Sequence, residues 1–130
     1  MAILDTFQSD VVLGKVQSSD LGYGVDEVTV TIEAGMKMGA ALESTSVAGK
    51  FTWVVAGTVD DCDAVLIDPQ AEGYDGELPA GDYTLVVARR GHTIAEDKFA
   101  LKSGTAANKL SAIAAFEKAG MNKVTDKVLG

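Results

Sequence analysis

The chain has 130 residues, 47% of them hydrophobic and 23% charged, so it is too apolar to belong to the disordered class and should fold around a core. Its net charge of −8, with the cations gathered in the C-terminal third, argues against a nucleic-acid footprint over the whole molecule. It lacks a secretory leader pattern, a window near the roughly 18 apolar residues of a membrane span, and a second cysteine, so we expect synthesis in a cytoplasm and no membrane partner.

The first two dozen residues differ in character from the rest. The cluster "SSDLGYG", residues 18–24, is rich in Ser, Asp and Gly and is typical of a loop. The segment before it contains a single short apolar run, residues 11–13. We therefore expect residues 1–24 to be an extended arm and residues 25–130 to be the folded domain.

The domain begins with a sequence of short strands. Val28, Val30 and Ile32 alternate with polar residues, which predicts a strand with one buried face. Glycine-punctuated runs of β-branched and aromatic residues predict the strands that follow. These are a short strand after the turn at 35–39, then 49–57, 63–68, 82–91, 97–102 and a closing strand within 121–129.

One helix is predicted, over residues 103–120. Its expected buried face consists of residues that recur at helical spacing, namely Ala106, Leu110, Ile113 and Ala114. Thr105 or Ser103 can cap its start, and Gly120 suits the left-handed position after its last turn. Many short strands and one late helix predict a small, mainly-β (α+β) domain.

The acidic stretch at 56–70 raises the question of a calcium site. Asp61 and Asp63 have the first spacing of a calcium loop, but no Asp-Gly turn follows and an apolar strand begins at once. We interpret the stretch as a solvated turn before a strand. A small calcium- or ligand-binding domain that uses loops 60–63 and 72–82 stays as the alternative hypothesis.

Catalytic patterns are missing from the sequence. There is no G-x-S-x-G, no H-E-x-x-H and no phosphate-binding glycine motif. His92, the only histidine, is expected in a turn after Arg90, and Cys62 is expected to be a small buried thiol. We therefore expect no enzyme and no cofactor or metal; an enzyme that uses His92 and Cys62 is a third hypothesis, without a named activity.

Three large side chains are candidates for an interface. Arg89 and Arg90 could grip carboxylates of a partner, although an exposed strand end with solvated cations explains them as well. Trp53, the only tryptophan, could anchor an interface or could belong to the core, on one face with Phe51 and Val55.

The order of elements resembles a known family. The segments "VTIEAGMKMGAALESTSVAGKFTWVVAGTVDDCDAVLID", "YTLVVARRGHTIAEDKFAL" and "AAFEKAGMNKV" are similar to tailed-phage head decoration proteins related to the lambda decoration protein. The similarity covers about residues 28 to 125 and lies in the pattern, with no diagnostic motif.

The resemblance implies a capsid cement protein of the virion with a β-tulip-like domain, one C-terminal helix and an N-terminal arm. Its relatives are homotrimers that bind the major capsid protein at three-fold positions on the outside of the expanded head and stabilise it against DNA pressure. They are not enzymes, and their N-terminal segment orders by adding to a sheet of the shell protein.

The arm offers one segment suited to such pairing. Its docking strand would consist of Asp10, Val11, Val12, Leu13 and Lys15, because strand addition takes affinity from main-chain hydrogen bonds. The lead-in lacks the proline- and threonine-rich character of the lambda protein, and the acidic segment 60–82 is extra. Individual capsid contacts of the lambda protein are therefore not carried over.

Overall fold

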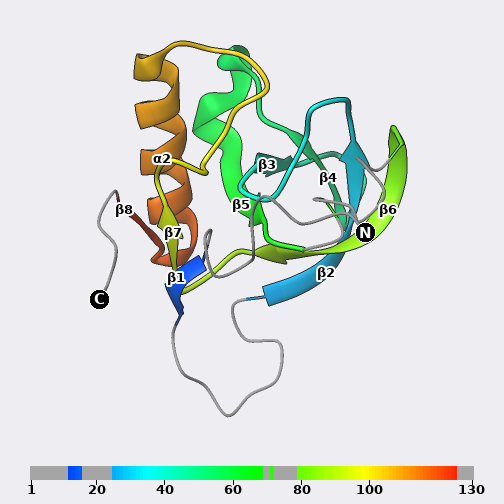
Figure 1. Cartoon of the computed structure of the whole chain (residues 1–130), viewed down its shortest axis with the longest axis horizontal. Coiled ribbons are helices and arrows are strands. Elements are labelled where there is room, and N and C mark those ends of the chain that lie inside the picture. Colours follow the sequence, from blue (N-terminus) through cyan, green and yellow to red (C-terminus); the bar gives the residue numbers. More distant parts are fainter. Residues whose placement is uncertain (1–11, 16–24, 69–70, 72–78, 126–130) are drawn as a thin grey trace, which may run out of the picture.

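The computed structural model describes residues 12–15, 25–68, 71 and 79–125. Within these residues the chain forms two sheets, one α-helix and one 3₁₀ helix (Figure 1). The elements in chain order are β1 (Val12–Lys15), β2 (Val25–Ile32), β3 (Ala41–Ser44), β4 (Lys50–Trp53), η1 (Ala56–Asp61), β5 (Cys62–Leu66), β6 (Gly81–Ala88), β7 (His92–Ala95), α2 (Ala106–Gly120) and β8 (Lys123–Thr125).

Five strands close into a barrel in the order β2-β4-β3-β5-β6. The longest ladder joins β2 and β6, antiparallel from Val25 opposite Ala88 to Ile32 opposite Gly81. The alternation predicted for β2 is confirmed, since Val30 and Ile32 are buried in the core. Because the sheet is closed, its strands pair on both sides and leave no long free edge.

The second sheet has three strands in the order β1-β7-β8, with β1 antiparallel and β8 parallel to the central β7. Helix α2 packs against β5 and η1 of the barrel part, and the second sheet lies at its C-terminal end (Figure 1). The expected mainly-β fold with one C-terminal helix is thus confirmed, and residues 12–15 of the expected arm form a strand of the second sheet.

The strand predicted at 97–102 is wrong. Residues 96–98 form a turn, and Ala100 makes only an isolated bridge to Ala40. The strand lies earlier, at His92–Ala95, so the turn expected at His92 is wrong as well. Phe99 is nevertheless fully buried, because the loop carries it into the core without strand pairing.

The aromatic run at 49–57 is shorter as a strand than predicted. β4 ends at Trp53 and η1 begins at Ala56, so the alternation of buried and exposed side chains stops at the end of β4. Phe51 is buried as expected, but Trp53 and Val55 are only half-buried, while Val54 has no exposed surface.

The start of α2 agrees with the sequence. The Thr105 hydroxyl accepts a hydrogen bond from the Asn108 N–H at 3.2 Å. In return, the Asn108 amide oxygen accepts from the Thr105 N–H at 2.8 Å. This reciprocal pair satisfies two backbone donors that a helix start otherwise leaves open.

The predicted buried face of α2 is wrong. The helix packs through Ala112, Ile113 and Phe116, and of the predicted set only Ile113 is buried. Leu110 keeps 66% of its surface exposed. Periodicity pointed to the wrong face because the helix carries apolar residues on both sides.

The end of α2 depends on a close approach of two backbones. The left-handed residue after the helix is Met121, with φ 55°, and not Gly120 as predicted. Gly120 is required for another reason, because a Cβ built on it would lie 1.9 Å from the carbonyl oxygen of Arg89. The helix end and the β6–β7 turn are therefore in direct backbone contact, and the Gly91 N–H donates to the Gly120 carbonyl at 2.9 Å.

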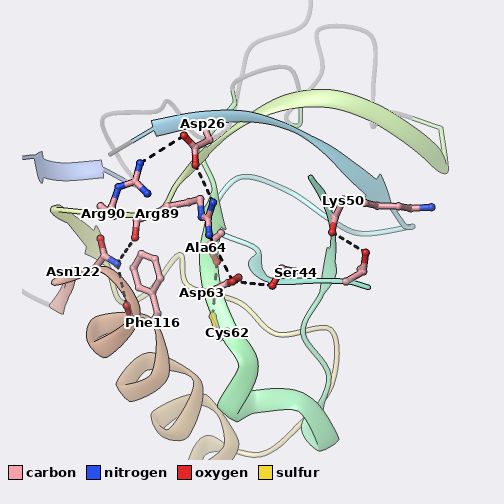
Figure 2. Close-up of polar contacts among 11 residues, drawn as sticks. Asp26, Ser44, Lys50, Cys62, Asp63, Ala64, Arg89, Arg90, Phe116 and Asn122 are labelled. Carbon is pink, nitrogen blue, oxygen red and sulfur yellow. Dashed lines mark hydrogen bonds and ion pairs between the residues drawn. The ribbon is translucent and has the colours of Figure 1, made fainter. Parts of the chain in front are cut away.

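The side chain of Asn122 stabilises the contact between the end of α2 and the β6–β7 turn. The amide oxygen accepts from the His92 N–H at 3.1 Å. The amide nitrogen donates to the carbonyls of Arg89 at 2.9 Å and Phe116 at 3.0 Å (Figure 2). The residue is 7% exposed. We call these contacts the Asn122 junction; it joins the end of β6, the start of β7 and the last turns of α2.

We expect Asn122→Ala to lower the free energy of unfolding by about 2–4 kcal/mol, because three backbone groups lose a hydrogen bond to this side chain and two of these bonds are buried. Chemical denaturation measures the change. Asn108→Ala is the matched control, since it removes one helix cap and should cost about 1 kcal/mol. If the Asn122→Ala protein were as stable as the Asn108→Ala protein, the Asn122 side chain would not stabilise the fold as we expect.

Candidate functional site

A cluster of charged side chains occupies one end of the barrel (Figure 2). The Arg89 guanidinium lies 3.1 Å from the Asp26 carboxylate and 4.0 Å from that of Asp63. The Ser44 hydroxyl donates to Asp63 at 3.0 Å, and the guanidinium stands 5.3 Å from the centre of the Phe51 ring. These internal partners hold Arg89 in place, since a guanidinium both pairs with carboxylates and stacks on rings.

Arg90 reaches the same cluster from the outside. Its guanidinium lies 3.8 Å from the second oxygen of Asp26, and its side chain is 44% exposed, against 33% for Arg89. The structure therefore brings the two predicted arginines together on one carboxylate. Arg90 is the one with more surface open to a partner.

Trp53 is not part of this cluster. Its indole N–H donates to the Ala100 carbonyl at 3.1 Å, and the half-buried ring borders a surface hollow of about 300 Å³. Lys37, Met38 and Lys98 line the same hollow. The tryptophan is thus fixed by a hydrogen bond while one side of the ring faces a depression of the surface.

The predicted docking segment is described only in part. Asp10 and Val11 lie outside the described residues, whereas Val12, Leu13 and Lys15 belong to β1. β1 pairs with β7, with Val12 opposite Ile94. Its other edge has no strand partner within the part of the chain that the structure describes. Such an edge offers a row of main-chain groups to an added strand.

The opposite edge of the same sheet is occupied by a side chain. The carbonyl of Thr125 accepts from the Glu96 N–H at 2.8 Å, so the polar groups of Thr125 face the β7 side. Those of Val124, its neighbour in β8, face outward. The Val124 N–H donates to the Glu117 carboxylate at 3.0 Å. Glu117 therefore blocks the outer edge of β8.

The acidic residues of the two proposed loops have separate surroundings. Asp60 and Asp61 are exposed at the end of η1, while Asp63 belongs to the barrel-end cluster. Asp82 accepts from the Thr31 hydroxyl at 2.7 Å and pairs with Lys50 at 3.2 Å, and these contacts lower the pKa of its carboxyl. In the described ranges no three His, Cys, Asp or Glu residues lie close enough to hold a metal, and residues 72–78 lie outside those ranges.

Cys62 and His92 lie in different sheets. Cys62 is buried in β5, as expected, and this burial raises the pKa of its thiol to about 12, so it is uncharged near neutral pH. His92 begins β7, where its Nδ1 lies 2.8 Å from the Arg90 carbonyl. The structure does not bring the two residues into one catalytic arrangement.

Sequence reasoning missed two residues that shape this part of the molecule. Asn122 and Glu117 position the second sheet and block one of its edges. Asn122 is a polar residue directly after a helix, and Glu117 is a glutamate on a helix surface. Both situations are common in proteins. Neither residue carries a sequence signal for its role.

The fold and these side chains define a small β-rich domain with a cluster of paired charges at one end of its barrel. The chain matches, over residues 1–130, the family described as bacteriophage PhiTE minor capsid decoration protein, and it belongs to that family. It matches no curated protein and no solved structure. The predicted head decoration protein is thus confirmed.

Membership in this family places the protein on the virion and makes it a structural component of the capsid. For the residues that the structure describes, no helix is both long and apolar enough to span a bilayer.

Calcium at millimolar concentration should leave the melting temperature unchanged, because the described acids of both loops form no group of three that could hold a metal, and Asp63 and Asp82 are already paired. A bound ion would raise stability in proportion to its occupancy. Differential scanning fluorimetry with calcium and with EDTA measures the effect. A saturable rise that Asp60→Asn with Asp61→Asn removes would support the calcium hypothesis instead.

Proposed function

We propose that this protein is a non-enzymatic cement of the phage head that binds the major capsid protein as a homotrimer at three-fold positions and stabilises the shell against internal DNA pressure. The family match over residues 1–130 is the observation that carries the proposal. The protein is made in the host cytoplasm and binds neither nucleic acid nor membrane.

Attachment uses backbone pairing at the outer edge of β1. A strand of the shell protein adds to this edge, so main-chain hydrogen bonds supply affinity and the alternating side chains set the register. Asp10 to Lys15 form the docking segment. Support comes from β1 itself, which is a strand with one unpaired edge among the described residues.

Pairing with β7 prepares β1 for this contact. A strand already ordered within its own sheet loses less conformational entropy on binding than a free segment does. The Asn122 junction holds the start of β7 against the barrel, so the edge has a defined direction relative to the domain. Pre-ordering of this kind raises affinity without adding contacts.

Three-fold assembly strengthens an attachment that is weak for a single β1 edge. A closed trimer presents three β1 edges to symmetric shell subunits, so the second and third attachments are intramolecular. The trimer thereby bridges several shell subunits, and this bridging resists their separation under pressure. The net charge of −8 adds steering toward a shell surface of positive potential.

Deletion of residues 1–20 should abolish attachment to expanded capsids, because it removes the docking strand. Deletion of residues 1–9 is the matched control; it leaves Asp10 to Lys15 in place and should retain most of the binding. Co-sedimentation with expanded capsids gives the occupancy, and circular dichroism checks that both proteins fold. Full occupancy after removal of residues 1–20 would eliminate the docking strand from the mechanism.

A further inference from the structure

The hollow of about 300 Å³ beside Trp53 has an apolar lining. Met38 and Ala40, both buried, line it together with the half-buried ring of Trp53. The indole N–H is already engaged with the Ala100 carbonyl, so the ring offers apolar surface to the hollow. The volume lies at the lower end of the range for ligand sites, roughly 300–1,000 Å³, and suits a side chain better than a whole peptide segment. We call this depression the Trp53 hollow.

Backbone contacts fix the walls of the Trp53 hollow. The Ala100 N–H donates to the Gly39 carbonyl at 3.0 Å, and the Ala41 N–H donates to the Ala100 carbonyl at 2.8 Å. A Cβ on Gly39 would lie 2.0 Å from the carbonyl oxygen of Lys98, so only glycine lets the two segments lie this close. Because its walls are already held by these contacts, the hollow needs little rearrangement to receive a side chain, and this raises affinity.

The rim of the Trp53 hollow is more positive than the rest of the chain. Two lysines, Lys37 and Lys98, line it against one carboxylate, Asp97, which gives a net charge of +1 in a chain of −8. Glu33 and Glu96, which are close to these residues in the sequence, pair with lysines that do not line the hollow. An acidic group is therefore attracted to the hollow, whereas the net charge of the chain repels it.

These features favour one kind of occupant, an apolar side chain with a carboxylate next to it. The apolar lining removes the side chain from water, and the lysines of the rim attract the carboxylate. Membership in the decoration-protein family gives the capsid as the binding partner. A shell carboxylate that is attracted at this hollow and repelled by the rest of the chain fixes the orientation in which the two proteins meet.

We propose that the Trp53 hollow is a second contact with the capsid, and that it receives an apolar side chain of the shell protein flanked by an aspartate or a glutamate. The inference rests on the capsid binding of the proposed function, but it needs neither the homotrimer nor pairing at the edge of β1. It makes the only tryptophan of the chain an anchor of the interface.

Lys37→Glu tests the contact, with Lys118→Glu as the matched control. Both lysines are exposed and both substitutions change the net charge equally, but Lys118 lies in the last turn of α2 and does not line the hollow. Lys37→Glu should raise the Kd for expanded, undecorated heads about tenfold, and the rise should shrink as salt is added, because salt screens exposed charges. Lys118→Glu should bind as the unaltered protein does. Co-sedimentation over a range of protein concentrations measures both.

Hydroxyl-radical footprinting reports on the tryptophan itself. Trp53 should be oxidised several-fold more slowly on heads than in the free protein, because the occupant covers the ring. The mass of the peptide that contains Trp53 separates this signal from tryptophans of the shell protein.

The proposal is overturned if Lys37→Glu binds heads as the unaltered protein does, if Lys118→Glu weakens attachment equally, or if Trp53 is as reactive on heads as in solution. A free oligomer in which Trp53 is already protected, and which Lys37→Glu dissociates, would assign the hollow to a second copy of the chain and also overturn it.

The deletion of residues 1–20 separates this inference from the proposed attachment. If that deletion abolishes binding while Lys37→Glu binds normally, the edge of β1 is the contact and the hollow is not. If the deleted protein still attaches while Lys37→Glu weakens attachment, the hollow is a contact and the β1 edge is not. An unaltered protein that does not bind heads would overturn both.

Discussion

The buried amide of Asn122 holds together the three parts of this small domain. It satisfies one backbone group at the end of β6, one at the start of β7 and one in the last turns of α2. Gly120 permits this arrangement, because any side chain there would collide with the Arg89 carbonyl. The barrel, the second sheet and the helix are therefore not independent, and the second sheet has a fixed direction relative to the barrel.

The edges of the two sheets differ in whether they can accept another strand. The barrel closes on itself, and Glu117 occupies the outer edge of β8. Within the described residues, β1 is left as the strand with an unpaired edge. Exposed edges invite uncontrolled pairing, so soluble proteins usually protect them. In the attachment that we propose, the open edge of β1 receives a strand of the shell protein, whereas the edge of β8 is blocked.

Features that depend on neighbouring residues could be predicted from the sequence. Features that depend on contacts between residues distant in the sequence could not. The alternation in β2 and the cap at Thr105 depend on neighbouring residues, and both predictions are confirmed. Gly120 was assigned the wrong role, because its need arises from a backbone distant in sequence. The face of α2 was misjudged because apolar residues occupy both sides. In the candidate site, the two arginines were singled out as candidates to bind carboxylates of a partner, and this stays a prediction. Their shared internal partner, Asp26, lies 63 residues before Arg89 and has no sequence signal.

We propose that attachment occurs by backbone pairing at the edge of β1, on a sheet that the Asn122 junction holds in place. Electron cryomicroscopy of decorated heads, at a resolution that shows strands, would reveal this contact. We expect a shell strand hydrogen-bonded along the outer edge of β1, with β7 still paired on the other side. Shell density that touches only the outer surface of β2 and β6, with the edge of β1 in solvent, would contradict it.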